Sequence, residues 1–270
     1  MTPGIQLAID VSSDLAATCR AMAARSRAVQ LVQDENDCAA LLTDSVDSAT
    51  SAANAGRKVL LLNPLTLSTE TCQYLQDSNA TMPAHTSRFK PSIQPVKRAL
   101  DAGKLGEPGL LRIHCWNADV GNTVSAVSEL DLALWMFGGR PVEIFALERP
   151  GYLQIHLGFN DAGMAIIDFD SASPGGNEYY SLSMIGSTGA AYADDHHNMN
   201  LLLNSGGTST LLTPQRDSAL AATIDCFATA VRDGGEFSPN WRDTLAAKQA
   251  GTQVRESIEQ HAVVAGGTDV

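Results

Sequence analysis

The side chains of this sequence that are best suited to chemistry gather at two places. The run Asp194-Asp195-His196-His197 is the densest group of potential metal ligands. Adjacent residues on a strand point to opposite faces, so at most two of these four converge, whereas a catalytic metal needs about three protein ligands. We therefore expect a solvated loop there and no metal site. His114 and Cys115, with Asp119 nearby, suggest a Cys–His pair, but the same alternation favours a core strand.

Composition and charge exclude several classes of function. The chain has 270 residues and a formal net charge of −12, which argues against a nucleic-acid groove and against binding to anionic membranes. No apolar run is long enough to span a bilayer, and the opening MTPGIQLAID does not resemble a signal peptide, so we expect a cytoplasmic protein. The cysteines are scattered and odd in number, which favours buried thiols over disulfides or structural zinc. They are Cys19, Cys38, Cys72, Cys115 and Cys226.

The first third of the chain alternates short apolar runs with Ala-rich helical patterns. KVLLLN, residues 58–63, is continuous and apolar, as a strand buried on both faces should be. Strands that alternate with helices predict a parallel, doubly wound sheet. The pattern predicts strands at 5–10, 29–32, 39–43 and 58–63, and helices at 12–25, 46–55 and 67–78.

After residue 88 the pattern changes to a meander of antiparallel strands whose connections carry Gly, Asn, Asp and Pro. The predicted fold class is therefore α/β plus α+β, a truncated Rossmann-like parallel sheet domain followed by a domain with a large open, mainly antiparallel sheet. We place the first domain at 1–90, with a C-terminal helix at about 241–262 packing back on it, and the second at 91–240. The predicted helices are 92–102, 124–137, 218–233 and 241–261, and the predicted strands are 110–118, 142–148, 152–159, 164–171, 178–186, 190–193, 200–204 and 208–212.

Four collinear segments resemble the glucose–fructose oxidoreductase and inositol dehydrogenase (Gfo/Idh/MocA) family. They are AGRKVLLLNPLTLS at 55–68, SRFKPSIQPVKRALDAGKLGEPGLLRIHC at 87–115, VSELDLALWMFGGRPVEIFA at 127–146 and SMIGSTGAAYADD at 183–195. The resemblance implies a Rossmann domain followed by a domain with a large open sheet. It also implies NAD(P)-dependent oxidation of sugars or cyclitols.

The phosphate-binding loop of that family has no counterpart here. A dinucleotide fold needs glycines after its first strand, and this chain has none between Gly4 and Gly56. In one alignment Val11 and Ser13 replace the glycines. In the other, the first strand–helix unit is missing and Asp10 stands as the ribose-binding acid. Both alignments leave the domain about one strand–helix unit short and remove the phosphate cradle.

The family's catalytic positions are also replaced. Asn63 stands where the resemblance puts a lysine, and Val124 and Ser128 stand where it puts an aspartate and a histidine. None of these three side chains can accept and return a proton near pH 7. We therefore predict no catalytic residue and no metal ligand.

Four side chains remain as candidates for a residual pocket. They are Asn63, Arg88, Ser128 and Glu129. Arg88 and Lys97 are expected to support the domain junction, with a pocket role as the alternative. Glu129 is a candidate for binding a sugar hydroxyl, with a helix-surface carboxylate as the simpler reading.

The sequence thus predicts a catalytically degenerate relative of the family, without a cofactor, acting as a binding module or as the partner subunit of an active paralogue. The alternative is an NAD- or NADP-dependent oxidoreductase of a sugar or cyclitol with an atypical site. A third possibility is sugar binding without redox chemistry. The strands YLQIHLGF and MAIIDFD carry apolar faces, so we also expect a homo-oligomer formed through the C-terminal sheet.

Overall fold

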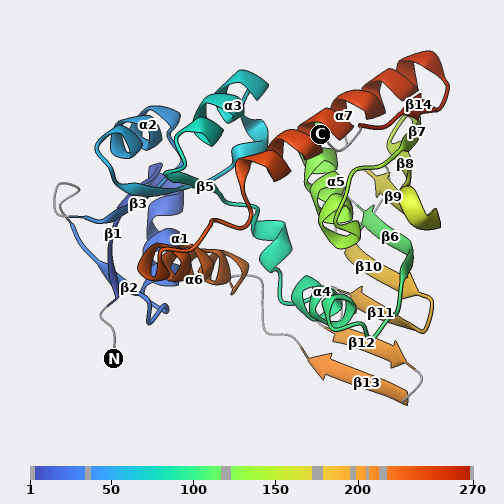
Figure 1. Ribbon diagram of the computed structural model, residues 1–270, viewed down its shortest axis with the longest axis horizontal. Coiled ribbons are helices and arrows are strands. Elements are labelled where there is room, and N and C mark those ends of the chain that lie inside the picture. The colour runs from blue at the N-terminus through green and yellow to red at the C-terminus, as the bar shows by residue number, and fades with distance from the viewer. Residues whose placement is uncertain are drawn as a thin grey trace. The chain divides into compact units, whose positions relative to one another are not determined.

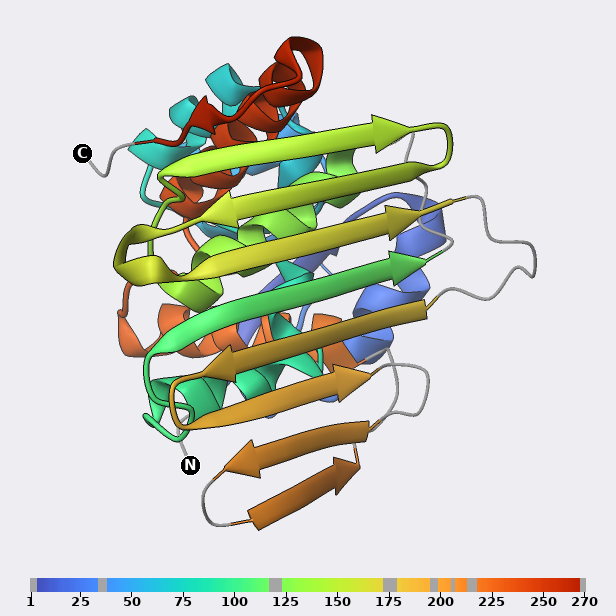
Figure 2. The ribbon, with the colours of Figure 1, turned by 90° about the vertical axis from the view of Figure 1, so that its right-hand side faces the viewer.

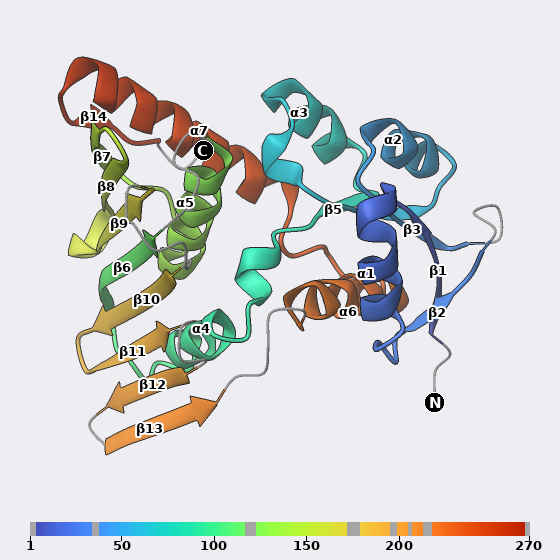
Figure 3. The same cartoon turned by 180° about the vertical axis from the view of Figure 1, so that it is seen from behind.

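The chain folds into two units, each with its own sheet (Figures 1 and 3). The computed structural model describes residues 4–33, 38–116, 123–171, 179–194, 199–204, 207–212 and 218–267. The first unit is Met1–Lys90 with Arg216–Leu245, and the second is Pro91–Gln215 with Ala246–Val270. The boundary near residue 90 lies where the sequence analysis puts it.

A five-stranded parallel sheet forms the centre of the first unit, in the order β2-β1-β3-β4-β5. A six-stranded dinucleotide-binding sheet has the order 3-2-1-4-5-6. Removing either its first or its third strand leaves the order seen here, so strand order does not distinguish the two alignments. The strands are β1 (Ile5–Asp10), β2 (Val29–Leu31), β3 (Ala40–Thr43), β4 (Lys58–Leu61) and β5 (Thr81–Pro83).

The connection from β2 to β3 is unusually short for a crossover between parallel strands. Leu7 of β1 pairs with Leu31 at the end of β2 on one side and with Ala40 at the start of β3 on the other. β2 therefore pairs with the first half of β1, residues 5–7, and β3 pairs with the second half, residues 7–10. Only eight residues, 32–39, separate the two strands in the sequence.

Helices cover both faces of this sheet. Figure 1 shows α2 (Val46–Asn54) and α3 (Thr69–Asp77) on one side, and α1 (Ser13–Ala23) and α6 (Ser218–Asp233) on the other. Ile224 and Phe227 of α6 are fully buried against Leu7, Leu42 and Leu60 of the sheet.

The helices after residue 215 correct the predicted division of the chain. The sequence analysis assigns residues 218–233 to the second domain and lets the last helix pack back on the first. The structure places α6 in the first unit, because its apolar side joins that core. The last helix, α7 (Trp241–Gln260), contributes Trp241 and Leu245 to the first unit, whereas its Ala250 and Val254 belong to the core of the second.

The second unit contains a nine-stranded sheet with the order β13-β12-β11-β10-β6-β9-β8-β7-β14. All neighbours are antiparallel except β6 and β9, which are parallel. Figure 2 shows the sheet face-on. The strands are β6 (Pro108–Trp116), β7 (Glu143–Arg149), β8 (Tyr152–Gly158), β9 (Met164–Asp170), β10 (Tyr179–Gly186), β11 (Gly189–Asp194), β12 (Met199–Asn204), β13 (Gly207–Leu212) and β14 (Val264–Ala265).

The two faces of this sheet differ. Its inner face, with Ile113, Ile155 and Ile167 fully buried, packs against α4 (Ile93–Asp101), α5 (Thr123–Phe137) and the second part of α7. None of the described helices covers the outer face, which Figure 2 presents to the viewer. The alternation of burial along β8 and β9 follows the period of two that the sequence shows.

Two short strands were absent from the sequence prediction. β5 has only three residues and ends at Pro83, which fits an edge strand but gives no periodic signal. β14 has only two residues, Val264 and Ala265, which pair with Ile144 and Glu143 of β7.

Candidate functional site

The candidate site of the first unit lies at the carboxyl ends of β1 and β3. In open α/β sheets, ligands bind where the strand order reverses, outside the carboxyl ends of the strands. Here the chain runs outward from β1 to β2 and then returns to β3 on the other side of β1, so the reversal falls between β1 and β3. Asp10 ends β1, and Asp44 directly follows β3.

The carboxylate of Asp44 contacts the N-terminus of α1. The backbone N–H of Ser12 donates to both of its oxygens, at 3.2 Å each. Ser12 is the N-cap of α1 and forms no side-chain cap of its own, so Asp44 supplies the negative charge that this helix end favours. In a dinucleotide-binding fold the pyrophosphate occupies that position.

The surrounding groups are acidic as well. Asp14 lies in the first turn of α1 and Asp47 in the first turn of α2, beside Asp10 and Asp44. The described turn from β1 to α1 contains no residue with positive φ, whereas a phosphate loop uses glycines there to bring its backbone close to the ligand. The residues present therefore do not fit a dinucleotide pyrophosphate, because carboxylates repel phosphate and the close backbone approach is missing.

Asn63 occupies the end of β4, next to β3 in the sheet. It is exposed and adopts a left-handed conformation with φ of 53° and ψ of 41°. Its carbonyl accepts a hydrogen bond from Thr66 Oγ1 at 2.8 Å, so its backbone shapes the turn that leads to α3. The exposed amide can bind a polar ligand but cannot replace an ammonium group.

Arg88 is 4% exposed and forms an ion pair with Asp243, with its Nη1 3.1 Å from Asp243 Oδ2. Two further contacts bring the start of α7 against the same unit. His85 Nε2 is 2.7 Å from Thr244 Oγ1, and Trp241 Nε1 donates to the carbonyl of Thr81 at 3.0 Å. These contacts place Arg88 in the packing of the first unit.

Glu129 is not the helix-surface carboxylate that the simpler of the two predictions describes. It is 7% exposed rather than on the helix surface, and Tyr180 Oη of β10 donates to its Oε2 at 2.9 Å. Ser128, the neighbouring candidate on α5, is half-buried. Asp131, also on α5, is 2% exposed. Asn63 and Arg88 belong to the first unit, whereas the α5 residues belong to the second.

The predicted alternation around Cys115 is confirmed. Cys115 faces the core of the second unit, whereas His114 lies on the outer face, where its Nδ1 is 3.0 Å from Asp168 Oδ2. Asp119 and residues 195–197 lie outside the described residues, as does the side chain of Val124. No group of three metal-ligating side chains occurs within the described part of the chain.

The cysteines are mostly buried thiols. None of the five forms a disulfide, and all except the half-buried Cys226 are buried. Burial raises the pKa of the Cys19 thiol of α1, and the negative charge of Asp44 raises it further. Burial also raises the pKa of Cys226. Both thiols therefore stay protonated at neutral pH, and a protonated thiol is a poor nucleophile.

Comparison with known proteins yields one sequence relative and many structural ones. Inositol 2-dehydrogenase 1 of Saccharopolyspora erythraea is 28% identical over 110 residues, which cover 36% of this chain and 33% of that enzyme. The match thus spans about a third of the length of the curated relative. No protein-family model matches the chain.

Solved structures share the fold over nearly the whole chain. An oxidoreductase from Agrobacterium radiobacter, in complex with NAD+, L-tartaric acid and magnesium, has a TM-score of 0.78 at 15% identity. The alignment covers 97% of this chain and 98% of that one. A myo-inositol dehydrogenase from Corynebacterium glutamicum gives the same TM-score and coverage at 18% identity. These matches confirm the predicted fold class, and together with the inositol dehydrogenase relative they support the resemblance to the Gfo/Idh/MocA family. Within the described residues, no helix is long and apolar enough to cross a membrane.

The contact between Tyr180 and Glu129 can be tested by removing one hydroxyl. Tyr180→Phe leaves the Glu129 carboxylate buried with one donor fewer, which should lower the free energy of unfolding by about 1–3 kcal/mol. Tyr152→Phe is the matched control, since Tyr152 is 52% exposed, and its effect should stay within about 0.5 kcal/mol. Urea denaturation measures both, and equal losses in the two variants would contradict the buried contact.

Proposed function

We propose that this chain, a member of the Gfo/Idh/MocA family, is a non-catalytic binding or partner subunit and has lost the family's redox reaction. The proposal rests on one observation, the Asp44 carboxylate on the N–H of Ser12 where a nucleotide phosphate would bind. Without the phosphate contacts a nicotinamide cofactor loses the interactions that orient it for hydride transfer. The protein would work in the cytoplasm without a cofactor.

Three replaced catalytic positions support the same proposal. Asn63, Ser128 and Val124 stand where the family resemblance puts a lysine, a histidine and an aspartate. Neither an exposed amide nor a half-buried hydroxyl exchanges a proton near neutral pH. Sugar binding without redox chemistry is compatible with these side chains, since amides and hydroxyls both donate and accept hydrogen bonds.

A second candidate function is an NAD- or NADP-dependent oxidoreductase of a sugar or cyclitol with an atypical site. The observation that favours it is the similarity of the chain to known oxidoreductases. The Agrobacterium oxidoreductase is described with NAD+ bound, and the sequence relative is an inositol dehydrogenase. In that case Asp10, at the end of β1, is the candidate for binding the nucleotide ribose.

Titration with NADH and NADPH separates the two functions. We expect no heat of binding and no rise in melting temperature up to about 1 mM of either nucleotide, whereas ligand at 100 times its Kd would stabilise the fold by about 2.7 kcal/mol. Binding by the wild type contradicts the proposal. In that outcome, loss of affinity in Asp10→Asn but not in Asp14→Asn, a control with the same change of charge, would identify the ribose contact.

We also propose that a second copy of this chain covers the outer face of the nine-stranded sheet. Three large side chains on that face are about half exposed: Trp116 at 47%, Tyr152 at 52% and Met164 at 49%. Aromatic residues and methionine are enriched in protein interfaces, and an uncovered apolar sheet face invites association. If the partner is instead an active paralogue, we expect it to bind the same outer face of the sheet.

Sedimentation velocity tests this interface. Met164→Asp puts a carboxylate on the outer face at the start of β9 and should weaken self-association by about tenfold or more, because burying an unpaired charge is unfavourable. Tyr74→Asp, at a residue of α3 that is 54% exposed, adds the same charge in the first unit and should leave association unchanged. A wild type that stays monomeric at high concentration, or two variants that behave alike, would rule out the interface.

A further inference from the structure

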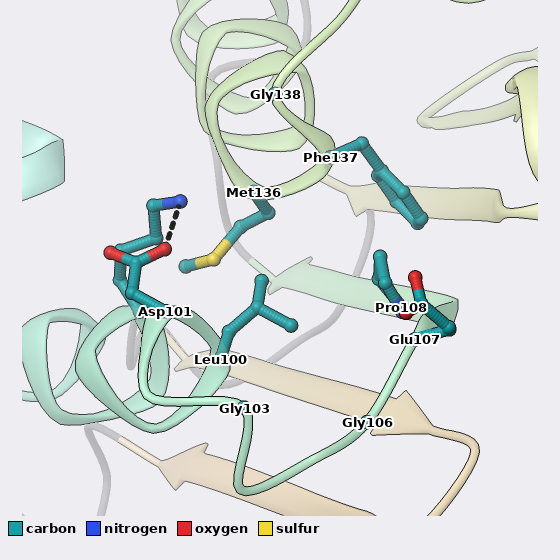
Figure 4. A pocket seen from close by; sticks show the side chains of 10 residues that line it. Leu100, Asp101, Gly103, Gly106, Glu107, Pro108, Met136, Phe137 and Gly138 are labelled. Carbon is teal, nitrogen blue, oxygen red and sulfur yellow. Dashed lines mark hydrogen bonds and ion pairs between the residues drawn. The ribbon is translucent and has the colours of Figure 1, made fainter.

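A pocket in the second unit contains one residue singled out in the sequence, Lys97, and none of the replaced catalytic positions. It has a volume of about 450 Å³ and opens where α4 and α5 end and β6 begins. That volume is within the range of about 300–1,000 Å³ typical of small-molecule sites. Figure 4 shows the pocket from close by. Its lining consists of Lys97, Leu100, Asp101, Gly103, Gly106, Glu107, Pro108, Met136, Phe137 and Gly138.

The floor of the pocket is apolar. The side chains of Leu100 and Met136 point toward each other across it, and Phe137 and Pro108 line the side nearer to Glu107 (Figure 4). Met136 is 2% exposed, so the floor is continuous with the core of the second unit. Such a surface suits an alkyl or aryl group of a ligand.

The polar part of the pocket is negative. α4 ends at Asp101 and α5 at Phe137, so two helix C-termini border it, and each carries a partial negative charge of about half an electron. Asp101 and Glu107 add two carboxylates. Lys97 is the one cation in the lining. Its Nζ is 2.7 Å from Asp101 Oδ1 and lies 5.4 Å from the centre of the Trp135 ring, so both partners hold it at one end of the pocket.

Glu107, at the other end, is held in place by its backbone. Its N–H donates to Ser187 Oγ at 3.0 Å, and its carbonyl accepts from the N–H of Ser187 at 2.9 Å. Gly106, just before it, has a φ of +71°, and a Cβ at this position would come within 2.2 Å of Ser187 Oγ. Among the described residues, no cationic side chain pairs with the Glu107 carboxylate.

From this geometry we propose that the pocket binds an organic cation, a primary alkyl- or arylalkylammonium whose body lies on Leu100, Met136 and Phe137. The ammonium group donates hydrogen bonds to Glu107 and is attracted by the two helix C-termini. An anion of the same size is excluded by the same charges, and a neutral alcohol keeps the apolar contact but loses the charge-assisted hydrogen bond. This site is independent of the proposed loss of nucleotide binding, since all its residues belong to the second unit.

Three probes of equal length test the proposal: n-hexylammonium, 1-hexanol and hexanoate. Each is titrated into the ¹⁵N-labelled full chain, and amide chemical shifts are followed at residues 103–107 and 137–138. We expect saturable shifts with hexylammonium, a Kd about fivefold higher with hexanol and no saturable shift with hexanoate. Absence of saturable shifts with hexylammonium, or equal affinity for hexanol, overturns the proposal.

Two variants then separate the site from the general attraction of cations to an acidic chain. Glu107→Gln should weaken hexylammonium binding by about fivefold, whereas Asp77→Asn, which makes the same change of charge on an exposed residue of α3, should leave it unchanged. Equal weakening in both variants would mean that net charge alone attracts the probe, and the proposal fails. Amide spectra of both variants without probe verify that they remain folded.

Discussion

The proposed function depends above all on the contact between Asp44 and the start of α1. A helix N-terminus at the reversal of strand order attracts negative charge, and in this chain a side chain provides that charge from within. An anion at such a position contributes about 0.3–2 kcal/mol to a helix, so a nucleotide phosphate would have to displace a favourable interaction. Three further carboxylates lie on the same elements: Asp10 at the end of β1, Asp14 in the first turn of α1 and Asp47 in the first turn of α2. The β1–α1 turn, without glycine, keeps the backbone from making the close approach that would compensate.

The second unit shares the architecture of the solved structures that the chain resembles. Gly186 of β10 is required there, because a Cβ at this position would lie 2.2 Å from the carbonyl oxygen of Leu105. Gly103 and Gly106, with φ of +68° and +71°, close the turn from α4 to β6 against the same hairpin. Glycines thus stand where they shape the open sheet, whereas the turn from β1 to α1 contains none.

Much of this fold follows from local patterns, and most of the candidate site does not. Periodicity places α6 at residues 218–233, but it cannot say which sheet buries Ile224 and Phe227, since an apolar helix side fits either core. β5 is too short for a periodic signal. Asp44 and Ser12 are 32 positions apart, and Tyr180 and Glu129 are 51 apart, so no spacing rule connects them. An aspartate directly after a buried parallel strand was the available signal for Asp44, because such residues gather at the carboxyl edge of the sheet.

The central claim, that Asp44 occupies the position of a nucleotide phosphate, is tested most directly at the amide of Ser12. Its ¹⁵N–¹H signal should be followed during titration with NADH in the wild type and in Asp44→Asn, with the chain otherwise unchanged. Our account predicts no saturable shift of the Ser12 signal in the wild type and a saturable one in Asp44→Asn, since removing the charge frees the helix end for an anion. A saturable shift in the wild type would show that phosphate binds despite the carboxylate. If the Ser12 signal shows no saturable shift in either protein, Asp44 is not the group that excludes the nucleotide.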